Sequence, residues 1–458
     1  MLPGKFLDRI RLQSYIDVPF LLSALERPGT VSIRLNPDKW NNIPVSSSPV
    51  PWCKLGFYLE TRPSFTADPL FHSGCYYPQE ASGMFLEVAY NQLFSGVENI
   101  KVLDLCGAPG GKSTHLSALI GNKGFLVANE VIRQRVSLLA ENIAKWGIPN
   151  TLVTNNDPSA FAKLTGYFDL IVVDAPCSGE GMFRDEVARG EWSEANASLC
   201  SERQRRILSN VWPALKYGGI LIYSTCTFNP AENEENIKWL TEKTDSESVK
   251  IDISSFTGIQ EISCGDITGY GFYPGKIEGD GFFLSVIRKL EKTEELRLNK
   301  KKINYSAASS DIKIAGTMIN NFFCDIYRHD DTVYKLSLPV GEFLSLRNFL
   351  KIIKGGTALF RTRKDDISPL HELAVSCLIK KDVSQVCDLD YGNALSFLRR
   401  ENFNLKNHSE GWILLRYLGV NLGFVKNIGT RINNYFPVDW RIRLGDSRLS
   451  YAKPVSWQ

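Results

Sequence analysis

The fold is decided by residues 103–114, Leu103-Asp104-Leu105-Cys106-Gly107-Ala108-Pro109-Gly110-Gly111-Lys112-Ser113-Thr114. This stretch completes a short apolar run, turns through three glycines and then begins a helical pattern. Glycines in such a turn let the backbone approach a ligand closely, and the free N–H groups of the helix start favour the same place. The stretch therefore predicts a strand–turn–helix unit with a ligand site in its turn.

Further apolar runs follow along the chain, each separated from the next by a longer segment. They are rich in valine, isoleucine and leucine without polar alternation, which is typical of strands buried on both faces. Strands joined by helices in this way predict a parallel α/β sheet. The five runs are residues 101–106, 125–130, 151–157, 168–176 and 218–226.

Two helices and a last strand can be predicted around these runs. In Arg133–Trp146 the apolar residues recur at helical spacing, and Gly147 marks the end of the helix. Asn229 as N-cap and Pro230 at the first helical position predict a second helix start. Residues 281–287 form another apolar run, which predicts a final buried strand.

The chain divides into four parts. Residues 96–290 contain the predicted sheet, and residues 1–95 combine two helical stretches with an extended segment at 31–36. Residues 291–311 are charged and polar, which is typical of a linker. Residues 312–458 are left to form at least one further domain.

The charge of the chain is uneven. Residues 301–458 carry 23 lysines and arginines against 15 acidic residues, whereas residues 1–300 carry 30 against 35. A basic tail domain is typical of proteins that bind nucleic acid, although a solvated surface of mixed charge would explain the same numbers.

The composition places the chain among globular proteins, with 43% hydrophobic and 22% charged residues. No apolar signal core stands at the N-terminus, and no apolar run approaches the roughly 18 residues that span a bilayer. We therefore expect a cytoplasmic protein that does not contact membranes. The ten cysteines include no Cys-x-x-Cys pair and the five histidines are scattered. We accordingly expect free thiols, with no disulfides and no metal site.

The sequence of the glycine-rich turn and the acidic residues that follow limit which class of ligand it can bind. A Walker A loop needs glycine where Cys106 stands, and the dinucleotide pattern Gly-x-Gly-x-x-Gly is absent. A purely structural turn remains the plain alternative. However, Glu130, Asp157 and Asp174 end three successive predicted strands. A carboxylate there suits ribose hydroxyls, and another can accept from an adenine amino group, so an adenosine-type ligand such as S-adenosylmethionine fits.

Two cysteines, Cys177 and Cys226, each end a predicted parallel strand. Most cysteines at such positions are buried core residues. These two lie in turns rich in proline, serine and threonine beyond the strand, at the sheet edge where ligands bind. A thiolate can attack carbon 6 of cytosine, which makes carbon 5 nucleophilic toward a methyl donor, and can leave again afterwards. Asp174 would help this attack by hydrogen bonding to ring nitrogen 3.

The motifs together resemble the RNA cytosine-C5 methyltransferases of the Sun/RsmB/RsmF family. The motifs that carry the resemblance are the loop 104–114, Asp174-Ala175-Pro176-Cys177-Ser178-Gly179, and Ser224-Thr225-Cys226-Thr227 followed by Glu232-Asn233-Glu234. The resemblance implies a Rossmann-like class I S-adenosylmethionine-dependent core. It further implies that Cys226 is the nucleophile, that Cys177 assists product release, and that Asp174 and Lys112 are catalytic. Residues alone had left the order of the two cysteines open.

The resemblance also implies which residues contact S-adenosylmethionine. Carried over position by position, they are Cys106, Gly107, Ala108, Pro109, Gly110, Gly111, Lys112, Glu130, Arg135, Asp157 and Asp174.

Further stretches are similar to RsmF-like enzymes that act on 16S rRNA. One is His72-Ser73-Gly74-Cys75-Tyr76-Tyr77-Pro78-Gln79-Glu80-Ala81-Ser82. The others, within a PUA-like domain, are Asn421-Leu422-Gly423-Phe424-Val425-Lys426 and Arg431-Ile432-Asn433-Asn434-Tyr435-Phe436-Pro437. The resemblance implies RNA-binding regions at 1–95 and 312–458. In the second, basic residues alternate with Tyr435, Phe436 and Trp440, which suits phosphate contact and base stacking, unless the aromatics are simply core.

These observations predict S-adenosylmethionine-dependent methylation of cytosine carbon 5 in RNA, with 16S rRNA of the small subunit as substrate. We expect a monomer. Two alternatives stay open at this stage, namely the same reaction on tRNA and a catalytically silent RNA-binding or ribosome assembly factor.

Overall fold

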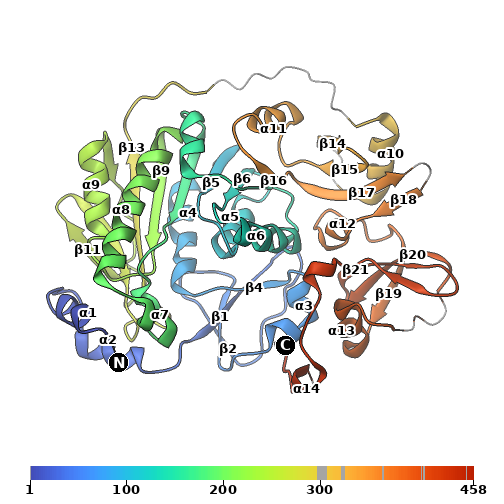
Figure 1. Ribbon diagram of the computed structural model, residues 1–458, viewed down its shortest axis with the longest axis horizontal. Coiled ribbons are helices and arrows are strands. Elements are labelled where there is room, and N and C mark those ends of the chain that lie inside the picture. Colours follow the sequence, from blue (N-terminus) through green and yellow to red (C-terminus); the bar gives the residue numbers. More distant parts are fainter. Residues whose placement is uncertain are drawn as a thin grey trace.

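The computed structural model describes residues 2–296, 307–320, 325–363, 366–403, 405, 408–449 and 451–458. A ten-stranded mixed sheet forms its centre, in the order β11-β12-β13-β9-β8-β5-β6-β7-β16, with β10 paired to β13 (Figure 1). In chain order these strands are β5 Ile100–Asp104, β6 Gly124–Asn129, β7 Thr151–Thr154, β8 Phe168–Asp174, β9 Leu215–Thr225, β10 Ser246–Ser248, β11 Gln260–Cys264, β12 Ile267–Phe272, β13 Phe282–Lys289 and β16 Ile352–Lys354.

The five strands predicted from apolar runs form the parallel part of this sheet. Neighbours in the series β9-β8-β5-β6-β7 all pair in parallel, so the predicted Rossmann-like core is confirmed. The run at 281–287 becomes β13, which lies antiparallel to β9. The helices of this region are α4 Leu86–Phe94, α5 Gly111–Ile120, α6 Arg133–Trp146, α7 Glu186–Glu191, α8 Glu194–Val211 and α9 Glu234–Lys243.

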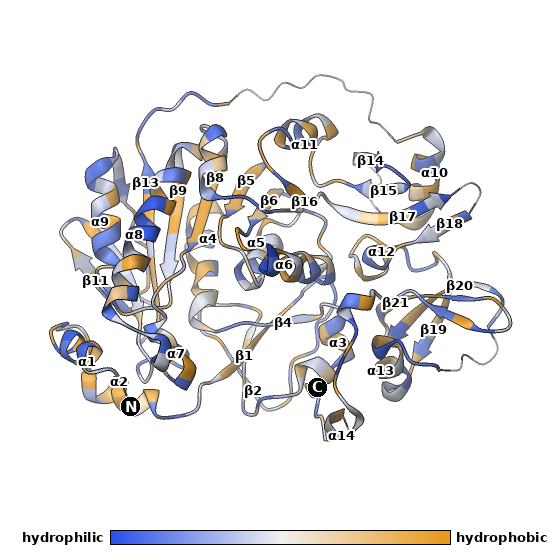
Figure 2. Cartoon of the chain, in the orientation of Figure 1, coloured by the Kyte–Doolittle hydropathy of each residue, from blue (hydrophilic) through white to orange (hydrophobic). Residues whose placement is uncertain are grey.

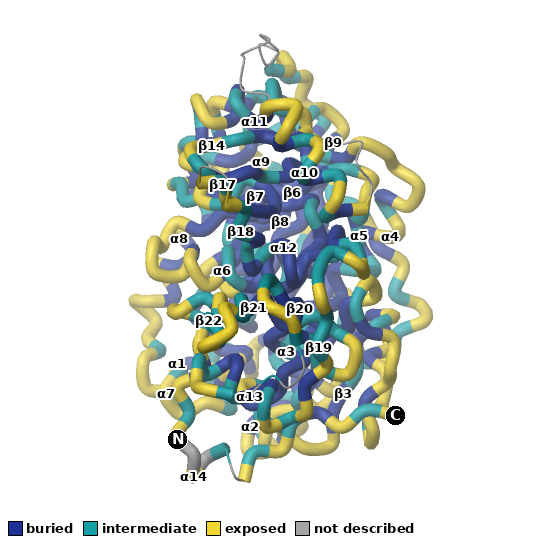
Figure 3. Tube along the Cα trace, turned by 90° about the vertical axis from the view of Figure 1, so that its right-hand side faces the viewer, coloured by how far each residue is buried: buried dark blue, intermediate teal, exposed yellow. Residues whose placement is uncertain are grey.

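Both faces of the parallel strands are covered. Adjacent residues of one strand point to opposite faces, so Val102 packs in one hydrophobic cluster and Leu103 in another. The same alternation holds for Leu126 and Val127. Figure 2 shows β8 and β9 as hydrophobic strands beside α8 and α9, which carry hydrophilic residues. Figure 3 shows the same centre as buried and its surrounding loops as exposed.

The predicted helix start at Asn229 is wrong. Asn229 Oδ1 accepts a hydrogen bond from the backbone of Ala231, which makes a turn, and α9 begins at Glu234. The reason is that Glu232 points inward, fully buried, to bind residues that follow β8. In a helix that began at Pro230, the Glu232 side chain would have pointed in a different direction.

The N-terminal part is α+β, as predicted. Its sheet has the order β2-β3-β1-β4, and the extended segment 31–36 contains its strand β1. The elements are α1 Gly4–Ile10, α2 Val18–Leu25, β1 Val31–Leu35, β2 Ser47–Pro49, β3 Gly56–Leu59, α3 Pro69–His72 and β4 Tyr76–Pro78.

The C-terminal part contains two four-stranded sheets, β14-β15-β17-β18 and β19-β20-β21-β22. Helix α10, Ser309–Met318, begins inside the predicted linker 291–311, whose middle lies outside the described residues. The other elements are β14 Ile326–His329, β15 Thr332–Lys335, α11 Val340–Leu346, β17 Thr357–Arg363, β18 Asp366–Pro369, α12 His371–Val375, β19 Gln385–Leu389, α13 Tyr391–Arg399, β20 Gly411–Tyr417, β21 Val420–Asn427, β22 Ile432–Asn434 and α14 Asp446–Leu449.

The C-terminal part is joined to the rest of the molecule at several points. Strand β16 pairs with β7, so residues beyond 312 extend the central sheet. The Lys39 Nζ donates to the backbone oxygens of Ser73 (2.7 Å), Lys145 (2.5 Å) and Val375 (2.5 Å), which belong to three parts of the chain. Packing contacts therefore continue across the domain boundary predicted at residue 312. Among the described residues, no helix is both long and apolar enough to cross a membrane.

Candidate active site

A cavity of about 340 Å³ lies at the carboxyl ends of the parallel strands. The loop between β5 and α5 forms one wall, and the turns after β8 and β9 form another. Among the predicted site residues, the cavity is lined by Cys106, Gly107, Ala108, Pro109, Gly111, Lys112, Asp174 and Cys226. The predicted residues that do not line it are Gly110, Glu130, Arg135, Asp157 and Cys177.

The two cysteines are adjacent, and they are not equivalent. Their Sγ atoms are 3.1 Å apart, and the backbone N–H of Cys226 donates to the sulfur of Cys177 at 3.3 Å. Cys226 lines the cavity, whereas Cys177 lies behind it. The contact with Cys226, together with burial, raises the pKa of Cys177 well above that of a free thiol. Cys177 therefore holds its proton and can donate it in a hydrogen bond to Cys226.

Asp174 and Lys112 form an ion pair beside Cys226. The Lys112 Nζ lies 2.9 Å from Asp174 Oδ2, and the Ser224 hydroxyl donates to Asp174 Oδ1 at 2.8 Å. Burial disfavours the ammonium of Lys112, but the charge of Asp174 and its hydrogen bond outweigh burial and raise the pKa of Lys112. The ammonium also faces the Phe282 ring at 5.0 Å. A positive proton donor is thus fixed at the cavity wall.

A buried carboxylate, Glu232, holds the two cysteine turns together. It accepts hydrogen bonds from the backbone N–H of Ser178 (2.9 Å), from the Ser178 hydroxyl and from the Gln204 amide. The Ser178 hydroxyl also contacts the Thr227 hydroxyl at 2.9 Å. Ser178 directly follows Cys177, and Thr227 directly follows Cys226. These contacts of Glu232, which we call the Glu232 clamp, therefore fix the distance between the two sulfurs.

The glycine-rich loop leaves little room for side chains. A Cβ at Gly107 would lie 2.6 Å from Ser113 Oγ and 3.3 Å from Asp104 Oδ2. Gly110 has a φ of +124°, in the region that favours glycine. Behind the loop, Asp104 is fully buried and its Oδ1 has no hydrogen-bond partner among the described residues. The loop therefore combines a backbone cradle with an unpaired carboxylate oxygen, which fits a cationic adenosyl cofactor.

Glu130 and Arg135 lie next to the loop. The Glu130 carboxylate accepts from the backbone N–H of Ile132 at 2.8 Å and lies 3.5 Å from the Arg135 guanidinium. Arg135 donates to the Ala108 carbonyl oxygen at 2.6 Å, which ties the loop to α6. Asp157, in contrast, is exposed and caps a short helical turn by accepting from Ser159. The structure thus places Glu130 and Arg135 near the cavity and Asp157 in a capping role.

Sequence reasoning missed several residues of the cavity wall. Glu80 is half-buried and accepts from the backbone N–H groups of Gly83 (3.0 Å) and Asp280 (2.8 Å). Burial raises the pKa of Glu80. Phe282 reaches the cavity from β13, and Tyr77 reaches it from β4. Tyr77 and Glu80 lie in the stretch 72–82 that resembles RsmF-like enzymes, but that resemblance assigned them no role, and Phe282 comes from an element far away in the chain.

The aromatic residues of the predicted PUA-like domain differ in exposure. Phe436 is buried in the core, where it contacts His371 at 5.0 Å between ring centroids. Tyr435 is exposed and packs on Trp412 at 4.5 Å. The Lys426 Nζ lies over the same Trp412 ring at 5.2 Å. A solvent-facing group of aromatic and basic side chains therefore exists, but Phe436 is not part of it.

One group of described residues could supply metal ligands. Cys53, Glu87 and His115 place their ligand atoms within 4.8 Å of one another, away from the cavity. The His115 ring nitrogen lies 2.9 Å from Glu87, and the Cys53 thiol donates to the same carboxylate at 3.1 Å. The three side chains contact one another, although His115 Nδ1 has no hydrogen-bond partner among the described residues, and the expectation of no metal stays a prediction.

The chain matches three protein-family models. Residues 92–288 match 16S rRNA methyltransferase RsmB/F, residues 2–81 match the N-terminal domain of 16S rRNA methyltransferase RsmF, and residues 384–442 match the methyltransferase RsmF PUA domain. The predicted family resemblance and the PUA-like domain are thereby confirmed.

Curated and solved relatives agree with these models. Ribosomal RNA small subunit methyltransferase F of Vibrio vulnificus (strain YJ016) is 30% identical over 473 residues, covering 95% of this chain and 97% of the relative. A methyltransferase homolog protein from Pyrococcus horikoshii is 28% identical, with 63% of this chain and 100% of that chain covered at a TM-score of 0.51. The structure of NSun6 from Pyrococcus horikoshii with SFG is 21% identical, with 60% and 95% covered at a TM-score of 0.50, and supports the fold alone.

Proposed function

The chain belongs to the 16S rRNA methyltransferase RsmB/F family, and from this premise we propose that it methylates carbon 5 of cytosine in small-subunit ribosomal RNA. It is an RNA methyltransferase. S-adenosylmethionine is the proposed methyl donor. One observation carries the proposal, namely that Cys226 faces a cavity that also contains the Asp174–Lys112 pair, with Cys177 in contact behind it.

The proposed reaction begins with attack by the Cys226 thiolate on carbon 6 of the cytosine ring. The ring needs a proton or a hydrogen bond at nitrogen 3 to accept the electron pair. A paired, ionised Asp174 can only accept hydrogen bonds, so we assign the proton to Lys112 and its positioning to Asp174. The half-buried thiol of Cys177 stabilises the neighbouring thiolate by donating to it.

The remaining steps return the enzyme to its starting state. Carbon 5 takes the methyl group, which leaves a saturated carbon that still carries its proton. A base removes that proton, the electron pair restores the ring double bond, and the bond between carbon 6 and Cys226 breaks. The proton on nitrogen 3 returns to Lys112. Cys177 assists release by donating a hydrogen bond to the departing Cys226 thiolate, which is 3.1 Å away.

The cofactor residues are proposed on the same basis. When bound, S-adenosylmethionine supplies an electrophilic methyl group on a sulfonium cation. The backbone of Cys106, Gly107, Ala108, Pro109, Gly110 and Gly111 would hold it beside Lys112 and Asp174. Glu130 would accept from ribose hydroxyls, and Arg135 would hold the loop through the Ala108 carbonyl. Asp157 would contact adenine only if it left its present cap on Ser159.

The partners and place of action are also proposals. RNA would contact residues 1–95 and 312–458, which precede and follow the core at 96–290 in the sequence, with 291–311 as linker. The enzyme would act as a cytoplasmic monomer on RNA of the small subunit, and its target base must be unpaired or flipped. The same reaction on tRNA remains the second candidate. A catalytically silent role is disfavoured because both cysteines and the ion pair are present.

The order of the two cysteines can be tested with substituted proteins. Cys226→Ala should abolish methyl transfer while S-adenosylmethionine still binds, because the cavity keeps its loop. Cys177→Ala should instead accumulate a covalent RNA–protein adduct, since release of Cys226 is impaired. Denaturing gel electrophoresis with labelled small-subunit RNA separates the two cases. An adduct with Cys226→Ala and none with Cys177→Ala would reverse the assigned roles.

A further inference from the structure

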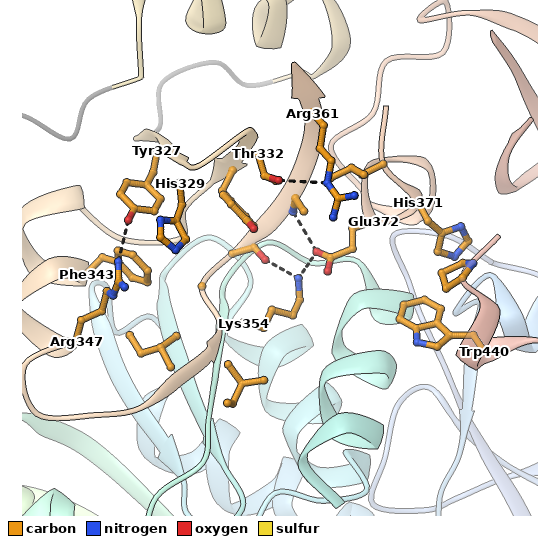
Figure 4. A pocket seen from close by; sticks show the side chains of 18 residues that line it. Tyr327, His329, Thr332, Phe343, Arg347, Lys354, Arg361, His371, Glu372 and Trp440 are labelled. Atoms are coloured by element: carbon orange, nitrogen blue, oxygen red, sulfur yellow. Dashed lines mark hydrogen bonds and ion pairs between the residues drawn. The ribbon is translucent and has the colours of Figure 1, made fainter. Parts of the chain in front are cut away.

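A second cavity, of about 560 Å³, lies in the C-terminal part, away from the two cysteines (Figure 4). Its walls come from β14, β15, β16, β17, α11 and α12, with Trp440 closing one side. The three matched family models cover residues 2–81, 92–288 and 384–442, so most of this cavity falls in a segment that none of them covers. Nothing in the proposed reaction uses it.

Aromatic rings line the cavity. Tyr327 packs against Phe343 at 5.3 Å between centroids, and His329 stacks on Tyr327 with 24° between the ring planes. Tyr334 and Trp440 are half-buried and keep part of their rings accessible. Partly exposed aromatic faces in a concave site can stack on a nucleobase.

Cationic groups stand at the rim. Arg347 and Arg361 are both exposed, and Arg347 donates to the Tyr327 hydroxyl at 2.9 Å. Within the described chain, Arg347 has no carboxylate at ion-pair distance, so its charge is available to a phosphate. Of the described residues that line the cavity, Glu372 is the one with a carboxylate, and it is already paired with Lys354 (Figure 4). The cavity therefore favours an anion at its rim.

His371 forms a buried part of the cavity wall and packs against the Trp440 ring at 5.2 Å between centroids. Its side chain lines the cavity and is only 8% exposed, yet neither ring nitrogen has a hydrogen-bond partner among the described residues. Burial, followed by the nearby charges of Lys145 and Lys39, lowers the pKa of His371 to about 3. The ring is thus neutral. Both ring nitrogens are enclosed by the protein, so His371 contributes a ring face to the wall and no hydrogen-bonding edge.

The cavity also lies beside the sheet that carries the active site. Ile352 and Lys354 line it from β16, and Ile352 pairs with Thr154 at the carboxyl end of β7. This is the sheet edge at which Cys226 and the glycine-rich loop are placed. An RNA strand bound at that edge can extend to the cavity along one side of the molecule.

We propose that this cavity binds one unpaired nucleotide of the RNA substrate, away from the target cytosine. The base stacks on Tyr334 and Trp440, and the adjoining phosphates contact Arg347 and Arg361. The proposal rests on the proposed function, because it names a second contact of the same RNA. It adds a binding subsite to the enzyme and makes no change to the reaction.

The test compares two arginines of one strand. Arg361 and Arg363 both lie on β17, and both contact Asp331, at 3.9 Å and 3.0 Å respectively. Only Arg361 lines the cavity. Arg361→Gln should therefore weaken RNA binding, and Arg363→Gln is the matched control that changes the protein's net charge equally. Tyr334→Leu removes a stacking face without changing charge.

Binding is measured by fluorescence anisotropy with the full chain and a labelled single-stranded RNA of about 12 nucleotides, a length within the range of such sites. Arg361→Gln and Tyr334→Leu should each raise the dissociation constant about tenfold. Arg361→Gln should also lower the salt dependence by about 0.7 in the log–log slope. Arg363→Gln should bind like the unsubstituted protein. Equal losses for the two arginines, or unchanged binding in all variants, would overturn the proposal.

Methyl transfer measured in parallel separates this inference from the proposed function. If the unsubstituted protein methylates RNA while Arg361→Gln and Tyr334→Leu bind it normally, the cavity is not an RNA subsite and the function stands. If it binds RNA through the cavity but transfers no methyl group, the proposed function fails and the subsite stands. Because Arg361 is exposed, its substitution preserves the fold and keeps the comparison valid even if Tyr334→Leu unfolds the sheet.

Discussion

Binding of S-adenosylmethionine should release a proton from Asp104 near neutral pH. Asp104 is fully buried at the end of β5, where Ser113 donates to its Oδ2 at 2.6 Å and its Oδ1 is unpaired. Burial raises the pKa of Asp104 to about 7, from an ordinary 3.8, and the Asp174 charge adds to this effect. A sulfonium cation bound in the adjoining loop favours the ionised carboxylate. The bound state therefore holds fewer protons than the free state.

The size of the effect follows from the pKa of about 7. The ionised fraction of Asp104 is about 0.1 at pH 6, 0.5 at pH 7 and 0.9 at pH 8. If only the ionised form binds the cation well, affinity rises about tenfold between pH 6 and pH 8. About half a proton is then released per cofactor at pH 7. The free energy of unfolding of the cofactor-free protein changes with pH in the opposite direction. Because the pKa of Asp104 is higher in the folded than in the unfolded state, its contribution to stability falls as the pH rises from about 4 to about 7.

Isothermal titration calorimetry in two buffers of different ionisation enthalpy measures this proton directly. The apparent binding enthalpy should differ between phosphate and Tris for the unsubstituted protein. Asp104→Asn keeps an oxygen that accepts from Ser113 but cannot ionise, so its binding should be independent of buffer and nearly flat from pH 6 to pH 8. Proton release that persists in Asp104→Asn would refute the reasoning and assign the proton to another group.

Two substitutions test the packing that holds the site in place. Lys39→Met should lower the free energy of unfolding, measured by urea denaturation, by about 2 kcal/mol, because three backbone oxygens from three parts of the chain lose their donor. The control is Lys54→Met, which should have no effect because Lys54 is exposed. Equal changes would show that the contact does not couple the parts. Glu232→Ala should lower kcat more than it raises KM for S-adenosylmethionine, because the buried N–H of Ser178 loses its acceptor and the cysteine turns separate. A normal kcat would show that the clamp does not position the cysteines.

Sequence patterns predicted the features that depend on neighbouring residues. Helix α6 was predicted at Arg133–Trp146, and its bounds are confirmed because helical spacing and Gly147 are local signals. The cysteines met at one sheet edge because parallel strands end on the same side. Those two predictions needed no knowledge of distant contacts.

Features set by distant contacts were not predictable in this way. The start of α9 was misplaced because Glu232 is drawn inward by Ser178, 54 positions earlier. The wall residue Glu80 is held by the backbone of Asp280, and β16 joins β7 from the far end of the chain. The cap role of Asp157 also depends on a helical turn at Ser159 that carried no strong signal.

The central claim is methylation of cytosine carbon 5 in small-subunit RNA through Cys226. The most direct measurement incubates the full chain with 16S rRNA and methyl-labelled S-adenosylmethionine, and then identifies the labelled nucleoside by mass spectrometry. The account predicts label in 5-methylcytidine, absent with Cys226→Ala. Label in another nucleoside, or 5-methylcytidine that still forms with Cys226→Ala, would contradict it.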